Sequence, residues 1–197
     1  MNARGDHAAA AREAARAFKA GQGGLSVIEV LFQGTVARSS ELRAEYQRLA
    51  DVLPFGSDKV LPYLADAVVA IEDGEHKKAL DLAQRVVPQL PAGPVGSGAF
   101  FPLRQPRMLA EYVRGRAKLG LGDAAAAKPH FETIVNGGYW RLFIPIEYVR
   151  SHYYLAQIAE KAGDTARASE HYRRFLFYWK DGDIDRDKVA EATKKTS

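Results

Sequence analysis

The chain has 197 residues, of which 47% are hydrophobic and 26% charged, and its net charge is +4. This is an ordinary globular composition, which excludes a disordered or fibrous chain. The absence of cysteine excludes disulfides, thiol catalysis and thiolate metal sites. No stretch approaches the roughly 20 apolar residues that cross a bilayer, and the N-terminus has no apolar signal core. We therefore expect a cytoplasmic protein without a membrane partner.

The beginning of the chain permits two interpretations. Gly21-Gln22, followed by Ser26 and Val30, matches a degenerate copy of the repeat described below. However, residues 29–34 (Glu-Val-Leu-Phe-Gln-Gly) resemble the core of a picornaviral protease site that is used to remove purification tags. In that case the residues before Gly34 are foreign to the fold.

The next predicted helix runs from Ser39 to Leu53, and residues 54–56 (Pro-Phe-Gly) end it. Its apolar residues are expected to face inward: Leu42, Tyr46, Leu49, Val52 and Leu53. We place a boundary here, between N-terminal helices in residues 1–56 and a helical repeat domain in residues 57–197.

The repeat domain contains one short pattern three times: a glycine, an acidic residue directly after it, and an alanine five residues after the glycine. The copies are Gly74-Glu75 with Ala79, Gly122-Asp123 with Ala127, and Gly163-Asp164 with Ala168. Four residues after each alanine come Ala83, Phe131 and Tyr172. The glycine suits the left-handed end of one helix, the aspartates at the second and third copies suit the start of the next, and the alanine permits close packing. The pattern predicts an all-α fold, a right-handed solenoid of helical hairpins like that of tetratricopeptide repeats.

Two irregular segments account for the spacing of the copies, which exceeds the about 34 residues of an uninterrupted tetratricopeptide repeat. Residues 88–106 hold too many prolines and glycines for a helix, and residues 136–146 carry aromatic side chains that we expect to be exposed. Pro129 falls inside a predicted second helix and should kink it.

Several runs carry a resemblance to a known family. They are Leu61-Pro62, Gly74 with Ala79-Leu80, residues 112–117, residues 131–135 and, most specifically, residues 162–168 with 172–183. From about Asp58 onward the chain resembles the tetratricopeptide-type C-terminal region of bacterial multidomain sensors, including some serine/threonine protein kinases and winged-helix transcription regulators. The resemblance implies a noncatalytic interaction or sensing module in bacterial signalling. No kinase signature occurs in the sequence.

Catalytic and metal-binding patterns were sought without success. The histidines have no metal-ligand spacing, and we expect the last two at a helix surface or groove: His7, His76, His130, His152 and His171. Alternating aspartates imitate the start of a calcium-binding loop: Asp181, Asp183, Asp185 and Asp187. Arg186 and Ala192 stand where that loop needs glycine and glutamate, so the segment is interpreted as an acidic connector. We expect no enzyme activity, no cofactor and no metal.

The resemblance also implies which side chains line a partner-binding groove, because the first helix of a tetratricopeptide hairpin faces the concave surface. Counting back from Gly122 and Gly163 gives Leu109, Tyr112 and Arg116, and Arg150, Tyr153 and Gln157. Except for Leu109, these are our predicted partner-binding residues. Arginine and tyrosine suit an acidic or C-terminal peptide. The family's dedicated carboxylate clamp uses asparagines that are missing here, so that clamp is not inferred. Alternatively, the arginines form only surface ion pairs.

Three functions follow as hypotheses. The first is a noncatalytic scaffold or sensing module that binds a protein or peptide in the groove. The alternative is a regulatory module that binds a small ligand or a nucleic acid, although basic residues interspersed with acids disfavour nucleic acid. The third is an enzyme that uses carboxylate chemistry without a known motif.

Overall fold

The computed structural model describes residues 6–20, 25–52, 60–89 and 106–196, and every regular element within them is a helix. The elements are α1 (His7–Lys19), α2 (Leu25–Val36), α3 (Ser40–Val52), α4 (Leu61–Glu72), α5 (His76–Val86), η3 (Val87–Gln89), α6 (Pro106–Gly120), α7 (Ala124–Val135), η4 (Gly138–Phe143), α8 (Pro145–Lys161), α9 (Thr165–Trp179) and α10 (Arg186–Thr196). The all-α prediction is confirmed for this part of the chain. None of the described helices is long and apolar enough to cross a membrane.

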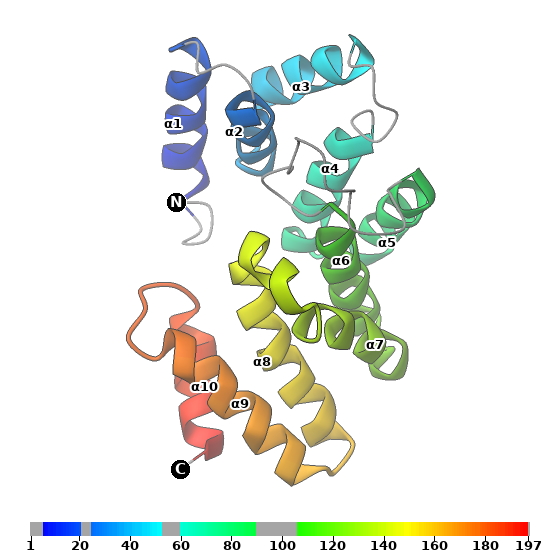
Figure 1. Ribbon diagram of the computed structural model, residues 1–197, viewed down its shortest axis with the longest axis vertical. Helices are drawn as coiled ribbons and strands as arrows, with labels where there is room; N and C mark the ends of the chain where they lie inside the picture. Colours follow the sequence, from blue (N-terminus) through cyan, green and yellow to red (C-terminus); the bar gives the residue numbers. More distant parts are fainter. Residues whose placement is uncertain (1–5, 21–24, 53–59, 90–105, 197) are drawn as a thin grey trace.

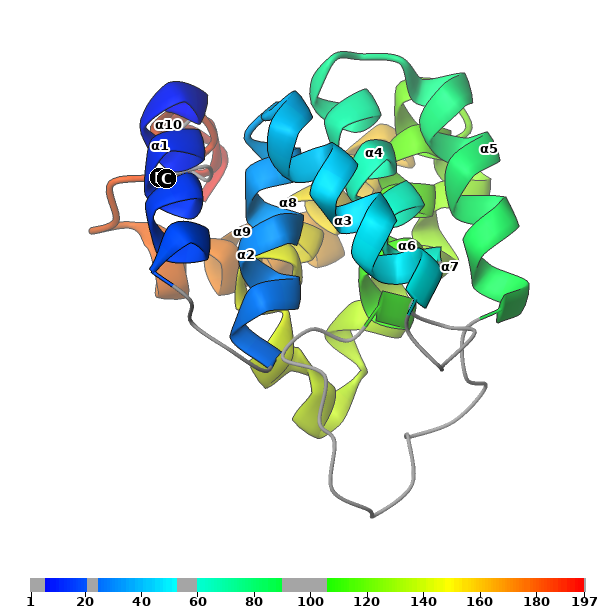
Figure 2. The same ribbon diagram turned by 90° about the horizontal axis from the view of Figure 1, so that it is seen from above.

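The helices pack as successive pairs along the chain (Figure 1). The pairs are α2 with α3, α4 with α5, α6 with α7, and α8 with α9, and each of α5 and α7 also packs against the first helix of the following pair. In both views α1 and α10 lie on one side of the molecule and α5 and α7 on the other (Figures 1 and 2). The row of pairs is therefore bent.

Three of the pairs are joined by the same turn, as the repeat pattern predicts. The glycines at the turns have positive φ angles of 75°, 86° and 77° (Gly74, Gly122 and Gly163). The residue after each glycine donates its amide to a carbonyl five residues earlier, at 2.8, 2.9 and 2.9 Å, which closes the helix end. The Asp123 and Asp164 carboxylates then accept the amides of Ala126 and Arg167 and cap the next helix.

A fourth copy of this turn joins α2 to α3, with Arg38 in the left-handed conformation at φ 67°. The Ser39 amide donates to the carbonyl of Gly34 at 3.0 Å. The Ser39 hydroxyl accepts the amide of Leu42 at 3.3 Å. We sought the fourth copy at Gly21-Gln22, which lies outside the described residues. The pattern missed this turn because a non-glycine residue rarely adopts positive φ.

The repeat residues form the contacts between helices. The pattern alanines Ala79, Ala127 and Ala168 are buried, and so are Ala83, Phe131 and Tyr172 one turn later. Gly115 brings α6 against α7, since a Cβ atom there would lie 3.0 Å from the Phe131 ring. The packing role of the pattern is confirmed.

The N-terminal helices share a core with the repeat region. Leu31 and Phe32 of α2 are buried in an apolar cluster that extends from Ala14 to Ala117, on both sides of the predicted boundary at residue 56. The residues that resemble a protease site therefore lie in a helix that packs into this core. The burial of Leu31, Phe32 and Gly34 favours the interpretation that this segment belongs to the fold.

Some local predictions need correction. Val52 is 70% exposed, and Ala50 is buried in its place, because the buried face of α3 follows a spacing of four residues through Leu42, Tyr46 and Ala50. Pro129 lies inside α7, as predicted, and the helix continues to Val135, while the kink at this residue stays a prediction. In residues 136–146, Tyr139 is 58% exposed, as predicted, whereas Phe143 is only partly exposed and packs edge-on against Tyr139. This segment is less irregular than predicted, since residues 138–143 form η4 and α8 begins at Pro145. Residues 53–59 and 90–105 lie outside the described residues.

Candidate functional site

The groove positions predicted on α6 share one face of that helix. Leu109 and Tyr112 are buried, whereas Arg116 is partly exposed. The Nη1 atom of Arg116 donates to the Tyr112 hydroxyl at 3.2 Å. Its guanidinium carbon lies 4.6 Å from the centre of the Tyr154 ring, a cation–π contact. Arg116 is thus held between two tyrosines.

Arg116 has no carboxylate within ion-pair distance among the residues that the structure describes. Burial by itself would lower the pKa of Arg116. The interactions of its guanidinium with Tyr112 and Tyr154 outweigh burial, so the pKa of Arg116 is raised. The side chain therefore keeps its charge. A guanidinium that is held by phenol groups and lacks a counter-ion can accept an anion.

On α8, Arg150 is already paired. Its Nε and Nη2 atoms donate to the two carboxylate oxygens of Asp185 at 2.6 and 3.1 Å. Asp185 also accepts from the Lys188 ammonium at 2.8 Å, and its side chain is only 5% exposed. Desolvation alone would lower the pKa of Arg150, but its interactions with Tyr112 and Asp185 raise it. This bidentate pair fixes the start of α10 on α8.

Tyr153 and Gln157 of α8 are engaged by α10 as well. The Tyr153 hydroxyl donates to Oε2 of Glu191 at 2.5 Å. Gln157 donates from Nε2 to the Tyr153 hydroxyl at 3.0 Å and to Oε1 of Glu191 at 3.5 Å. Burial, and then the bond to Glu191, raise the pKa of Tyr153, so the phenol stays protonated and remains a donor.

The five predicted partner-binding residues therefore fall into two groups. Arg150, Tyr153 and Gln157 bind carboxylates of the same chain, and Tyr112 and Arg116 hold each other on the neighbouring helix. Sequence reasoning missed the internal partners Asp185 and Glu191. In the sequence Asp185 belongs to the acidic connector, and no local pattern connects it to Arg150, which lies 35 positions away.

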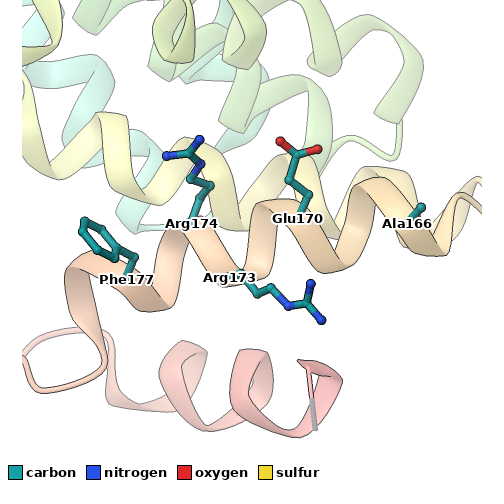
Figure 3. A pocket seen from close by; sticks show the side chains of 5 residues that line it. All are labelled: Ala166, Glu170, Arg173, Arg174 and Phe177. Atoms are coloured by element: carbon teal, nitrogen blue, oxygen red, sulfur yellow. The ribbon is translucent and has the colours of Figure 1, made fainter.

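A second candidate is a hollow of about 370 Å³ on the outer face of α9, lined by Ala166, Glu170, Arg173, Arg174 and Phe177 (Figure 3). All its lining residues come from one helix. Arg173 and Arg174 point to different sides in the close-up, so they do not converge on one ligand (Figure 3). Because a binding site needs convergent groups, we favour the face of α6 and α8.

Two histidines meet between α8 and α9, where Nδ1 of His152 lies 3.0 Å from Nδ1 of His171. His152 is buried, contrary to the surface or groove position that we expected, and its Nε2 atom has no hydrogen-bond partner in the described part of the chain. Burial, with smaller effects of His171 and Arg174, lowers the pKa of His152 from 6.5 to about 4. Burial and the contact with His171 therefore favour the neutral form of His152.

Because of His152, lowering the pH should decrease the stability of the fold. A group whose pKa is lower in the folded state stabilises the fold above its unfolded pKa, and this stability is lost as the pH falls from about 6.5 toward 4. Between pH 7 and pH 5 the free energy of unfolding should fall by about 2 kcal/mol more in the wild type than in His152→Gln. Urea titrations at both pH values measure this difference. An equal pH dependence of the two proteins would contradict the prediction.

The described residues contain no cluster of three or more histidine, aspartate or glutamate side chains that could hold a metal ion. Comparisons with protein-family models, with curated proteins and with solved structures found no match.

Proposed function

We propose that the chain is a tetratricopeptide-like helical solenoid that acts as a noncatalytic interaction module. Its groove face consists of Tyr112 and Arg116 of α6 with Arg150, Tyr153 and Gln157 of α8. The partner binds the α6 part of this face, because Asp185 and Glu191 already engage the three α8 side chains. Four helix pairs joined by equivalent turns support the solenoid, since repeated pairs of this kind stack on their neighbours. The partner is a protein or peptide segment.

One observation carries this proposal: side chains on the groove face of α8 bind carboxylates of a neighbouring segment, residues 185–191, whose helix α10 packs against α9. The segment is bound through Asp185 on Arg150 and through Glu191 on Tyr153. Ala192, the residue after Glu191, is fully buried in the apolar cluster that includes α8 and α9. Carboxylates are therefore the groups that this face of α8 binds, and the adjacent helix α6 presents related side chains.

The test begins with selecting peptides from a random library on the full chain. Amide chemical-shift changes on adding a selected peptide then locate its binding surface. We expect the changes on the groove face of α6 and the adjoining part of α8. Selected peptides that instead map to the outer face of α9 around Phe177, or to η4 around Tyr139, would overturn the proposal, as would a failure to select any peptide.

A further inference from the structure

The two groove-face helices carry an equivalent side-chain pair. Tyr112 and Arg116 stand 10 and 6 residues before Gly122, and Tyr153 and Gln157 stand 10 and 6 residues before Gly163. In both pairs the second side chain donates an N–H to the tyrosine hydroxyl, at 3.2 Å on α6 and 3.0 Å on α8. The local arrangement is thus repeated from one helix pair to the next.

On α8 this pair binds a carboxylate. The Tyr153 hydroxyl donates to one oxygen of Glu191, and the Gln157 amide lies at hydrogen-bond distance from the other. The tyrosine therefore acts as donor to the carboxylate and as acceptor for its helix neighbour. Both side chains are neutral in this site, since burial and Glu191 raise the pKa of Tyr153.

On α6 the same pair has no carboxylate among the described residues, although it is better equipped to bind one. Arg116 replaces the amide of Gln157 with a permanent positive charge and several N–H donors in one plane. One of these donors is used on Tyr112. The Tyr154 ring lies against the guanidinium and limits its orientations. On α4 the equivalent positions are Leu64 and Val68, so the site is not repeated there.

We propose that Tyr112 and Arg116 bind an aspartate or glutamate carboxylate of the partner, as Tyr153 and Gln157 bind Glu191. This inference rests on the proposed function for the nature of the partner, but the carboxylate site itself can be tested alone. The partner's acidic residue then lies against α6, next to Tyr154 of α8. Arg150 does not contribute a second cation, because Asp185 occupies its guanidinium.

The experiment is an NMR titration of the full chain that observes the Nε–Hε signal of Arg116. The probes are N-acetylglutamate amide, N-acetylglutamine amide and inorganic phosphate. We expect a saturable shift with the glutamate compound only. In Arg116→Gln, binding is observed through the chemical shift of the Tyr112 backbone amide. This variant should bind the glutamate compound more weakly, by about tenfold or more, because its side chain has no positive charge to strengthen the hydrogen bond to the carboxylate. Tyr112→Phe should weaken it less, and the outer-face control Arg173→Gln should not change it.

Three other results would overturn the proposal that Tyr112 and Arg116 bind a carboxylate. No response up to the highest soluble concentration, or an equal response to the glutamine compound, shows that the pair does not recognise a carboxylate. Tighter binding of phosphate assigns the site to phosphorylated partners instead. Helix content measured by circular dichroism verifies that each variant is folded. If the glutamate compound fails while selected peptides still map to the groove face, only this inference fails and the proposed function stands.

Discussion

Replacing Phe131 with alanine should lower the free energy of unfolding by about 3–5 kcal/mol, the range for a large buried aromatic side chain. Phe131 is fully buried. Its ring stacks on Tyr154 at 5.2 Å and meets Tyr112 edge-on at 6.3 Å, so it joins α6, α7 and α8. The cavity that the alanine variant leaves is not easily filled from α6, because Gly115, which faces the Phe131 ring, has no side chain.

Denaturant unfolding followed by circular dichroism measures this loss. The matched control is Phe177→Ala on α9, where the ring is 75% exposed and the loss should stay within about 0.5 kcal/mol. Equal losses in the two variants would mean that the three helices do not meet at Phe131. Because Phe131 supports Tyr154, the alanine variant should also bind carboxylates more weakly at Arg116.

Replacing Asp185 with asparagine should cost about 3 kcal/mol, because it leaves two partly buried cations, Arg150 and Lys188, without their shared carboxylate. Asparagine tolerates the positive φ of 52° at this position, so the change tests charge and not the backbone. We further expect faster hydrogen exchange of the α10 amides, since Asp185 attaches α10 to α8.

The control for this variant is Asp187→Asn. Asp187 also approaches Lys188, at 3.7 Å, but its side chain is 82% exposed. Such a surface pair contributes at most about 1 kcal/mol. If both variants lose the same small amount of stability, the pair of Arg150 with Asp185 does not hold α10 in place.

The helix pairs were largely predictable, because their signals are local. A glycine with positive φ and an aspartate cap determine where one helix ends and the next begins, as at Gly122-Asp123. The turn at Arg38 was not predictable, since arginine has no preference for that conformation. Val52 was misplaced because an apolar residue near a helix end does not by itself show which face is buried.

The candidate site was predictable only in part. Helical spacing placed Tyr112 and Arg116 on one face, and the structure shows the hydrogen bond between them. The contact of Tyr153 with Glu191 joins residues 38 positions apart and depends on how α10 docks. Short-range patterns carry no information on such docking. They could not distinguish the pair on α8, which binds Glu191, from the pair on α6, which binds no carboxylate among the described residues.

A double-mutant cycle between Arg116 and the acidic residue of a selected peptide measures directly whether the two groups bind each other. Affinities are measured for the wild type and Arg116→Gln, each with the original peptide and with its glutamate or aspartate changed to the amide. We expect a coupling energy of about 1.5 kcal/mol or more, as for a charge-assisted hydrogen bond. Additive effects of the two changes, with no coupling, would contradict this expectation.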